Sequence, residues 1–255
     1  MPPRAGLSQP ADIVRRGYDA IAAGQGGRFA NEIVPVEVSN PHVGVLVDTD
    51  ETPRADTSLE ALAALRPAFR PDGKVTAGNS SQICDGAAAV LLASERAVER
   101  LGLEPRARFV SFGLVGVDPH RMLHGNPQAC AKALERAGLG WDDMGVIEVN
   151  EAFASVVLQF VRDAGLGWDD VAVVEVNEAF ASVVLQFMQD AGLEERWADV
   201  NPNGGGISLG HPLGATGARV TGTLLNELER RGARYGIASM CIGFGQAIAG
   251  VVERL

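Results

Sequence analysis

The sequence is poor in cysteine, and its few cysteines lie far apart. Its 255 residues contain three cysteines and four histidines. The cysteines are Cys84, Cys130 and Cys241. Three scattered cysteines exclude the disulfide framework that stabilises many small secreted proteins. No cysteine lies at zinc-ligand spacing from a histidine, so we expect a protein without a bound metal.

Positive charge and long apolar runs are scarce as well. Lys and Arg number 22 against 32 Asp and Glu, a net charge of −10 that argues against a nucleic-acid partner. No run of about 18 apolar residues is present, so we expect no membrane span. The first residues, MPPRAGLSQP, lack the apolar stretch of a secretory signal. The expected location is therefore the cytoplasm.

Hydrophobic residues and glycines, by contrast, are plentiful. Hydrophobic residues make up 46% of the chain and 31 residues are glycine, which is enough for one large or two modest α/β domains. Apolar patterns predict strands at 33–38, 87–93, 108–115, 237–242 and 247–252. Helices are expected at 11–27, from an N-cap at Ser94 to Gly102, from an N-cap at Asn126 to Gly138, and from a glycine-rich loop (201–217) to Gly232. The segment 48–73 is expected to be a polar loop. The alternation of strands and helices predicts a layered α/β fold, with a boundary near 102–106.

A 27-residue repeat is the most unusual feature of the sequence. Residues 137–163 and 164–190 are identical at 22 of 27 positions. Each copy predicts a turn, a short strand (145–149 or 172–176) and an amphipathic helix. Because a solenoid needs at least three repeats to bury its apolar faces, we interpret the pair as a tandem duplication within one globular domain.

The segment 201–217, NPNGGGISLGHPLGATG, is rich in glycine and contains a single histidine, His211. Glycines allow backbone amides to approach a ligand closely, and a histidine with a reference pKa of about 6.5 suits acid–base chemistry near neutral pH. The segment is not a Walker loop, because no Lys-Ser/Thr pair closes it. Its composition leaves two interpretations open, a ligand-binding loop and a tight surface turn with an incidental histidine.

Cys241 lies at the end of an expected strand and is followed by Gly243 and Gly245. Backbone N–H groups at such glycines can point at an acyl oxygen, which favours a catalytic role. A cysteine in apolar sequence is more often a small buried residue, so both interpretations stand. Cys84 and Cys130 lack this setting, and we interpret both as structural.

Asn150 and Asn177, one in each copy of the repeat, follow the two expected strands. In open α/β sheets this edge is where ligands bind. Asparagine is also a favoured helix N-cap, which is the simpler role on local grounds.

Five segments together resemble the thiolase family. Three of them, NEAFA, NPNGGGISLGHPLGATGARV and CIGFGQ, occur in the order found in the C-terminal half of thiolases. VTAGNSSQICDGAAAVLL at 75–92 and GRFANEIVPV at 27–36 are also similar to the family. The resemblance implies a thiolase-like layered sheet. It also implies that residues 1–105 are the loop domain with the last strand and helix of the N-terminal half, and that residues 106–255 are the C-terminal domain.

The resemblance further implies an acyl-CoA C-acyltransferase that joins or cleaves acetyl-CoA and 3-ketoacyl-CoA. CoA would be the co-substrate, and no metal or other cofactor would be needed. In the family, the histidine of GHP activates an N-terminal cysteine that accepts the acyl group, and a second cysteine acts as acid and base. These roles imply His211 and Cys241, with the Gly243 amide in an oxyanion hole. The asparagine of NEAF, Asn177 or Asn150, would order a water at the enolate, and Ser81 would contact the pantetheine arm.

The sequence departs from the family pattern in two ways. No cysteine occupies the motif of the acyl-accepting nucleophile, so we expect the part of the N-terminal half that carries it to be missing. The second departure is the repeat, which has no counterpart in the family. Asn177 precedes His211 by 34 residues and Asn150 precedes it by 61. The shorter separation is close to that of the family, which favours Asn177. A smaller departure is Phe244, where the family commonly has glycine.

Three functions remain open at this point. The first is a thiolase-type acyltransferase whose activity as a lone chain is doubtful. The second is a catalytically silent CoA-binding or assembly module, and the third is a relic of truncation and duplication with little stable structure. The expected partners are acyl-CoA and CoA, together with either a homo-oligomer or a chain that supplies the N-terminal half.

Overall fold

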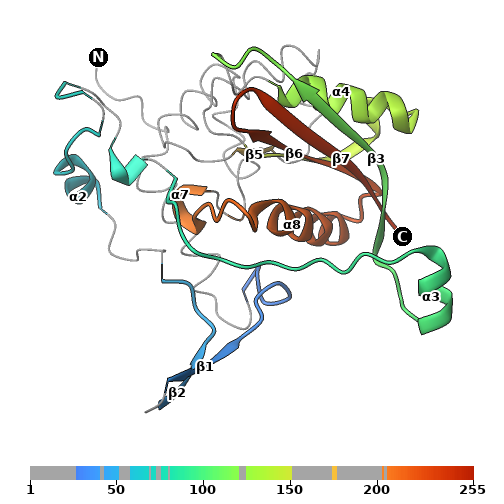
Figure 1. Cartoon of the computed structure of the whole chain (residues 1–255), viewed down its shortest axis with the longest axis horizontal. Helices are drawn as coiled ribbons and strands as arrows, with labels where there is room; N and C mark the ends of the chain where they lie inside the picture. Colours follow the sequence, from blue (N-terminus) through green and yellow to red (C-terminus); the bar gives the residue numbers. More distant parts are fainter. Residues whose placement is uncertain are drawn as a thin grey trace.

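Within the residues that the structure describes, a five-stranded mixed sheet with helices on both faces organises the C-terminal part of the chain (Figure 1). The structure is a computed structural model, and it describes residues 27–40, 43–51, 58–68, 70–72, 76–79, 81–120, 125–150, 174–176, 203 and 206–255. Its strands are β1 (Val36–Asn40), β2 (Val43–Val47), β3 (Ala107–Gly116), β4 (Met144–Asn150), β5 (Val174–Val176), β6 (Tyr235–Ile242) and β7 (Gln246–Arg254). Its helices are α2 (Leu59–Ala63), α3 (Glu95–Leu101), α4 (Asn126–Ala137), α7 (Gly206–Leu209) and α8 (Thr216–Arg231), with 3₁₀ turns at Ala77–Asn79 and Trp141–Asp143.

The order of the strands in the large sheet is β3-β7-β6-β4-β5. The strands β5, β4 and β6 run parallel, whereas β7 is antiparallel to both of its neighbours. The expected final strand pair is therefore confirmed as the β6–β7 hairpin, and the strand expected at 108–115 is confirmed as β3. Both strands expected in the repeat also form, as β4 and β5. They lie side by side with equivalent residues of the two copies paired, Ile147 with Val174 and Val149 with Val176.

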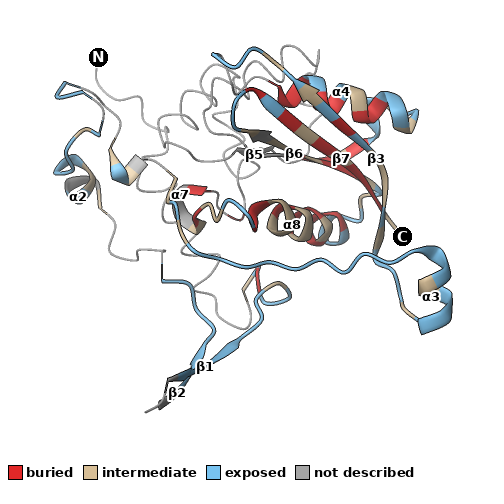
Figure 2. Ribbon diagram, viewed as in Figure 1, coloured by how far each residue is buried: buried red, intermediate tan, exposed pale blue. Residues whose placement is uncertain are grey.

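The core lies on both faces of this sheet (Figure 2). On one face, Leu224 and Leu228 of α8 pack against Val146 of β4 and Val252 of β7. On the other face α4 lies so close to β3 that a Cβ at Gly113 would meet the Ala129 carbonyl oxygen at 2.0 Å. Alternation of residue direction along each strand supplies both faces with apolar side chains, as a sheet covered on both sides requires.

Helix ends follow the expected capping residues with one exception. The Ser94 hydroxyl accepts a hydrogen bond from the Ala97 amide, and α3 ends at Gly102 with φ +62°. Gly138 and Gly232 end α4 and α8 in the same left-handed conformation, as expected. The N-cap of α4, however, is Gly125 and not Asn126. A Cβ at Gly125 would lie 2.9 Å from that of Ala247, so close packing against β7 requires glycine there.

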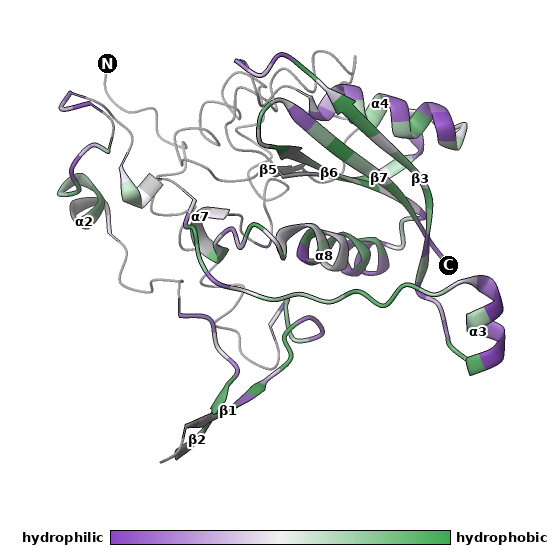
Figure 3. Ribbon diagram, in the orientation of Figure 1, coloured by the Kyte–Doolittle hydropathy of each residue, from purple (hydrophilic) through white to green (hydrophobic). Residues whose placement is uncertain are grey.

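The prediction of a strand at 87–93 is wrong. Residues 81–94 are extended but form no ladder with any strand of the described residues. The side chains at 87–93 are apolar (Figure 3) and exposed, with Leu91 82% and Leu92 70% accessible. An apolar run favours a strand only where another strand pairs with its backbone, and local sequence does not supply that partner.

Other expectations are corrected in detail. The strand expected at 33–38 lies at Val36–Asn40 and pairs with β2, a strand that the pattern did not predict. The expected loop at 48–73 contains α2, and the glycine-rich loop contains α7 and the start of α8. The helix expected at 11–27 and the helices of both repeat copies lie outside the described residues, apart from Gly27 in a bend. Among the helices of the described residues, none has the length and apolar character needed to cross a membrane.

Candidate active site

The carboxyl ends of β4 and β6 meet the glycine-rich loop at one edge of the sheet. Because β4 and β6 are parallel and adjacent, Asn150 at the end of β4 is paired with Met240, the residue before Cys241. The Met240 side chain also lies close to Gly217 in the first turn of α8: a Cβ built on Gly217 would be 3.7 Å from the Met240 methyl group. The loop that carries His211 leads directly into this turn. The backbones of Asn150 and Cys241 and the loop of His211 therefore share one edge.

Not every expected site residue is described to the same extent. His211, Ser81 and Gly243 are described in full. Asn150 and Cys241 are placed by their strands alone, and their side chains lie outside the described part, as does the whole of Asn177.

His211 is oriented by a threonine of α8. Its Nδ1 lies 2.8 Å from Thr216 Oγ1, and that hydroxyl donates a hydrogen bond to the Pro212 carbonyl oxygen at 2.9 Å. With the single hydrogen of the hydroxyl assigned to the Pro212 carbonyl, the imidazole is assigned as the donor, with its hydrogen on Nδ1. The lone pair of the neutral ring is then on Nε2. Sequence reasoning missed Thr216, although its place five residues after the histidine, at the start of α8, is visible in the sequence.

The electrostatic environment keeps this imidazole neutral. Burial of the ring, and secondly the positive charge of Arg219, hold the pKa of His211 below its ordinary value of 6.5. A neutral imidazole with a fixed tautomer at pH 7 is ready to accept a proton at Nε2. The geometry therefore favours a general base over an incidental surface histidine.

The segment 81–86 lies alongside the glycine-rich loop. The His211 amide donates to the Gln82 carbonyl oxygen at 2.8 Å, and the Gln82 amide donates to the Gly206 carbonyl oxygen at 3.3 Å. Gly210 has φ +87°, and a Cβ there would lie 2.4 Å from Cys84 Sγ. Only glycine satisfies both conditions without strain. Gln82 is thus hydrogen-bonded to the loop of His211, and the half-buried Ser81 is the residue directly before Gln82.

The two described thiols are unsuited to nucleophilic attack. Burial raises the pKa of Cys84; the hydrogen bond from the His211 amide opposes this only in part, and the charges of Asp50 and Asp85 raise the pKa further. Cys130 is fully buried in α4. Since the thiolate is the reactive form, the raised pKa leaves Cys84 unactivated at neutral pH, and its burial leaves Cys130 inaccessible, in agreement with a structural role for both.

The β6–β7 turn brings Gly243 next to the end of β6. Nothing lies within 4 Å of the position of a Cβ at Gly243, so the space beside its Cα is open. The following Phe244 has φ +63° and is 86% exposed. Gly245 has φ +80°, and its carbonyl oxygen accepts a hydrogen bond of 2.6 Å from the Val117 amide. The turn is thus fixed to the chain that follows β3.

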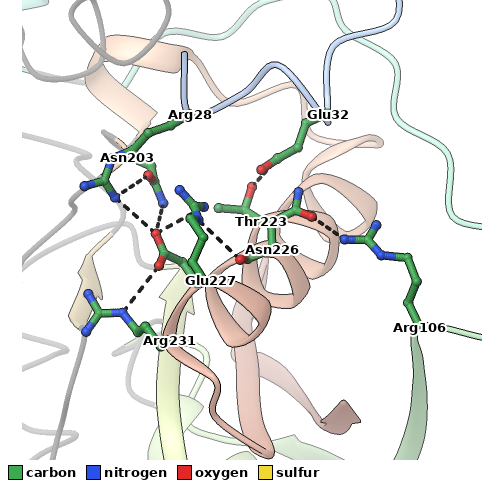
Figure 4. A network of polar contacts seen from close by, with 9 residues as sticks. Arg28, Glu32, Arg106, Asn203, Thr223, Asn226, Glu227 and Arg231 are labelled. Atoms are coloured by element: carbon green, nitrogen blue, oxygen red, sulfur yellow. Dashed lines mark hydrogen bonds and ion pairs between the residues drawn. The ribbon is translucent and has the colours of Figure 1, made fainter. Parts of the chain in front are cut away.

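A buried carboxylate on α8 anchors the start of the glycine-rich loop (Figure 4). The Asn203 amide group donates to Glu227 Oε1 at 2.9 Å, and Arg28 Nη1 lies 3.3 Å from the same oxygen and 3.2 Å from Asn203 Oδ1. Arg230 and Arg231 complete the ion pairs of Glu227. Since Thr216 holds His211 at the start of α8, this one helix positions both ends of the loop.

The same network joins the N-terminal segment to α8. Thr223 donates to Glu32 Oε2 at 2.8 Å, and Arg106, which precedes β3, contacts Asn226 and Glu229. In the described part of the chain, no group of three or more His, Cys, Asp or Glu side chains is arranged to hold a metal ion. The chemistry that the site offers is that of a histidine base, a strand-end cysteine and backbone amides.

Comparison with protein-family models identifies the family. The model of the thiolase C-terminal domain matches residues 103–166 and 159–254, and that of the thiolase N-terminal domain matches residues 14–96. The chain belongs to the thiolase family. The two C-terminal matches overlap at 159–166, and each contains one copy of the repeat. Thiolase sequence similarity thus accounts for both copies.

Individual relatives agree with this assignment. The chain is 46% identical over 235 residues to a beta-ketoadipyl-CoA thiolase of Acinetobacter baylyi, covering 92% of this chain and 52% of the relative. It is 45% identical over 250 residues to a 3-ketoacyl-CoA thiolase of Escherichia fergusonii, covering 97% and 58%. The chain therefore spans between half and three-fifths of the length of these relatives.

Solved structures support the thiolase fold. The acetyl-CoA acetyltransferase of Bacillus anthracis matches with a TM-score of 0.73 and 38% identity, covering 96% of this chain and 55% of that one. Human mitochondrial 3-ketoacyl-CoA thiolase in complex with CoA matches with a TM-score of 0.72 and 37% identity, covering 96% and 54%. The expected α/β thiolase-like architecture is confirmed.

Proposed function

We propose that this chain forms the C-terminal part of a thiolase-type acyltransferase acting on acetyl-CoA and 3-ketoacyl-CoA, with CoA as co-substrate and no metal or other cofactor. The observation that carries the proposal is the orientation of His211, whose hydrogen bond to Thr216 leaves Nε2 as a base at the sheet edge. The names of the relatives, thiolases of 3-ketoacyl-CoA and beta-ketoadipyl-CoA, support a 3-ketoacyl thioester as substrate.

The proposed roles follow from the placement of each residue. His211 takes the proton of the acyl-accepting thiol, which belongs to a segment outside these 255 residues. Cys241, at the end of β6, returns a proton to the carbanion that leaves when the carbon–carbon bond breaks. An asparagine of the repeat, Asn150 or Asn177, orders a water that stabilises the enolate, and the Gly243 amide stabilises the tetrahedral oxyanion, because fixed donors in a water-poor pocket favour developing negative charge.

Substrate binding and domain organisation complete the proposal. Ser81 contacts the pantetheine arm, since its segment is hydrogen-bonded to the loop of His211. Residues 1–105 serve as the loop domain with the last strand and helix of the N-terminal half, and residues 106–255 serve as the C-terminal domain. A homo-oligomer, or a chain that supplies the rest of the N-terminal half, completes the site.

The test is the cleavage of acetoacetyl-CoA by CoA, followed as the loss of the enolate absorbance of the 3-ketoacyl thioester. The 255-residue chain alone is expected to show no turnover, because no thiol in it accepts the acyl group. Addition of an N-terminal thiolase half is expected to produce turnover that His211→Ala and Cys241→Ala abolish. His120→Ala, at an exposed turn residue, is the matched control and should leave the rate unchanged.

Two results would overturn the proposal. Robust Cys241-dependent turnover by the lone chain would show that no further nucleophile is needed. An assembly that never turns over, while CoA still raises the unfolding temperature, would favour the silent CoA-binding module instead.

A further inference from the structure

The two copies of the repeat are not equivalent in the sheet. Copy one supplies β4, which is hydrogen-bonded to β6 from Met144 through Asn150. Copy two supplies β5, which among the described residues pairs with β4 alone and is the last strand of the sheet. The strand that carries Cys241, β6, therefore has the first copy as its direct neighbour.

Sequence spacing does not decide between the copies. In a parallel sheet, a strand followed by a helix returns the chain to the end of the sheet at which the strand began. A whole 27-residue unit can therefore be added while the later elements keep their places. The 34 residues between Asn177 and His211 arise equally if the extra unit was added before or after the working copy. Position relative to β6 is the observation that separates them.

The difference in position is large on the scale of a hydrogen bond. Neighbouring strands lie about 4.8 Å apart, so β5 is about 9.6 Å from β6 while β4 is at half that distance. An amide that orders a water at the enolate must lie within hydrogen-bond distance of that water, which in turn contacts the enolate oxygen. The end of β4 lies at the edge shared by Cys241 and the His211 loop, whereas the end of β5 is one strand further away.

We infer that the first copy is the working one, so that Asn150 and not Asn177 supplies the amide of the proposed site, and that the second copy is an added edge strand and helix. This inference rests on the proposed function for the role of the amide, but the strand assignment stands independently of it. The added strand also covers the edge of β4, which would otherwise expose unpaired backbone groups.

The first test is disulfide cross-linking between strands. Val149 of β4 is the register partner of Ser239 of β6, and Val176 is the equivalent of Val149 in copy two. The pair Val149→Cys/Ser239→Cys should oxidise to a disulfide, because register partners have Cα atoms within the 4.4–6.8 Å that a disulfide spans. The matched pair Val176→Cys/Ser239→Cys should not, since two strand spacings exceed about 7 Å.

Both pairs are prepared with Cys241→Ala, so that the native thiol does not compete. Tryptic peptides locate each disulfide, because cleavage after Arg162 separates the copies and the copies differ at residues such as Met144. A disulfide in the Val176 pair alone, or equal yields in both pairs, would overturn the inference.

The second test concerns the amide itself. In an assembly that turns over, Asn150→Ala is expected to lower kcat by about 100-fold, because the water that donates to the enolate loses its fixed position. Asn177→Ala should leave kcat unchanged, and the reverse pattern would overturn the inference. If no assembly turns over, the proposed acyl transfer fails while the cross-links still decide which copy adjoins β6.

Discussion

Replacing Gly210 by alanine should destabilise the loop that carries His211, for two separable reasons. Gly210 has φ +87°, a conformation that residues with a Cβ rarely adopt. The added methyl group would also lie 2.4 Å from Cys84 Sγ. The first cost is fixed by the backbone, whereas the second depends on a neighbouring side chain that can itself be shortened.

The two costs have different magnitudes. A left-handed conformation costs an L-residue about 1–2 kcal/mol. Insertion of a methyl group into a well-packed position costs about 1–3 kcal/mol. We therefore expect Gly210→Ala to lower the free energy of unfolding by roughly 2–5 kcal/mol. Adding Cys84→Ala should recover the packing part and leave the backbone part, which gives a positive coupling in a double-mutant cycle.

Urea unfolding of the wild type, Gly210→Ala, Cys84→Ala and the double variant measures this coupling, provided that the slope of the transition is the same in all four. Gly102→Ala is the control for the backbone cost alone, since φ is +62° and nothing lies within 4 Å of its Cβ. Gly214→Ala, in the same loop with open space and no positive φ, should leave stability unchanged or slightly raised. The reasoning is refuted if Gly210→Ala is no more destabilising than Gly214→Ala, or if Cys84→Ala recovers nothing.

Four further predictions concern the site and its support. Because burial lowers the pKa of His211, the unfolded chain protonates this imidazole more readily than the folded chain does. The stability that the neutral His211 contributes should therefore be present above pH 6.5 and decline as the pH falls below 6.5. NMR titration should show this pKa below 6.5, and Thr216→Val but not Thr216→Ser should lose the Nδ1-protonated tautomer; a pKa above 6.5 would contradict the assignment. Phe244→Gly should raise the unfolding free energy by about 1 kcal/mol by removing a positive φ from an exposed side chain, whereas a loss of stability on thermal or urea unfolding would argue against strain there. Glu227→Ala should cost about 1–3 kcal/mol in urea unfolding, because Asn203 and three half-exposed arginines lose their shared buried partner; an unchanged midpoint would remove this anchor from the account. Light scattering at micromolar concentration should find an assembly, because the apolar side chains of Ile83, Leu91 and Leu92 are exposed; a monodisperse monomer would disprove it.

Local sequence determined the elements whose signals are themselves local. The Ser94 hydroxyl caps α3, and Gly102, Gly138 and Gly232 end their helices, because caps and left-handed terminators act within a few residues. The strands β3, β6 and β7 carry their own apolar patterns and were predicted for that reason. The thiolase motifs likewise identified the family and pointed to His211.

Relations between distant segments were decided only by the tertiary structure. The apolar run at 87–93 forms no ladder in the described part of the chain, because a strand depends on a partner that its own residues do not specify. The tautomer of His211 depends on a threonine of α8, and the need for Gly210 depends on Cys84, more than a hundred residues earlier in the chain. The two copies of the repeat have nearly the same sequence, so local propensity cannot rank them; their order beside β6 follows from strand pairing across the whole domain, which places Asn150 next to the strand of Cys241.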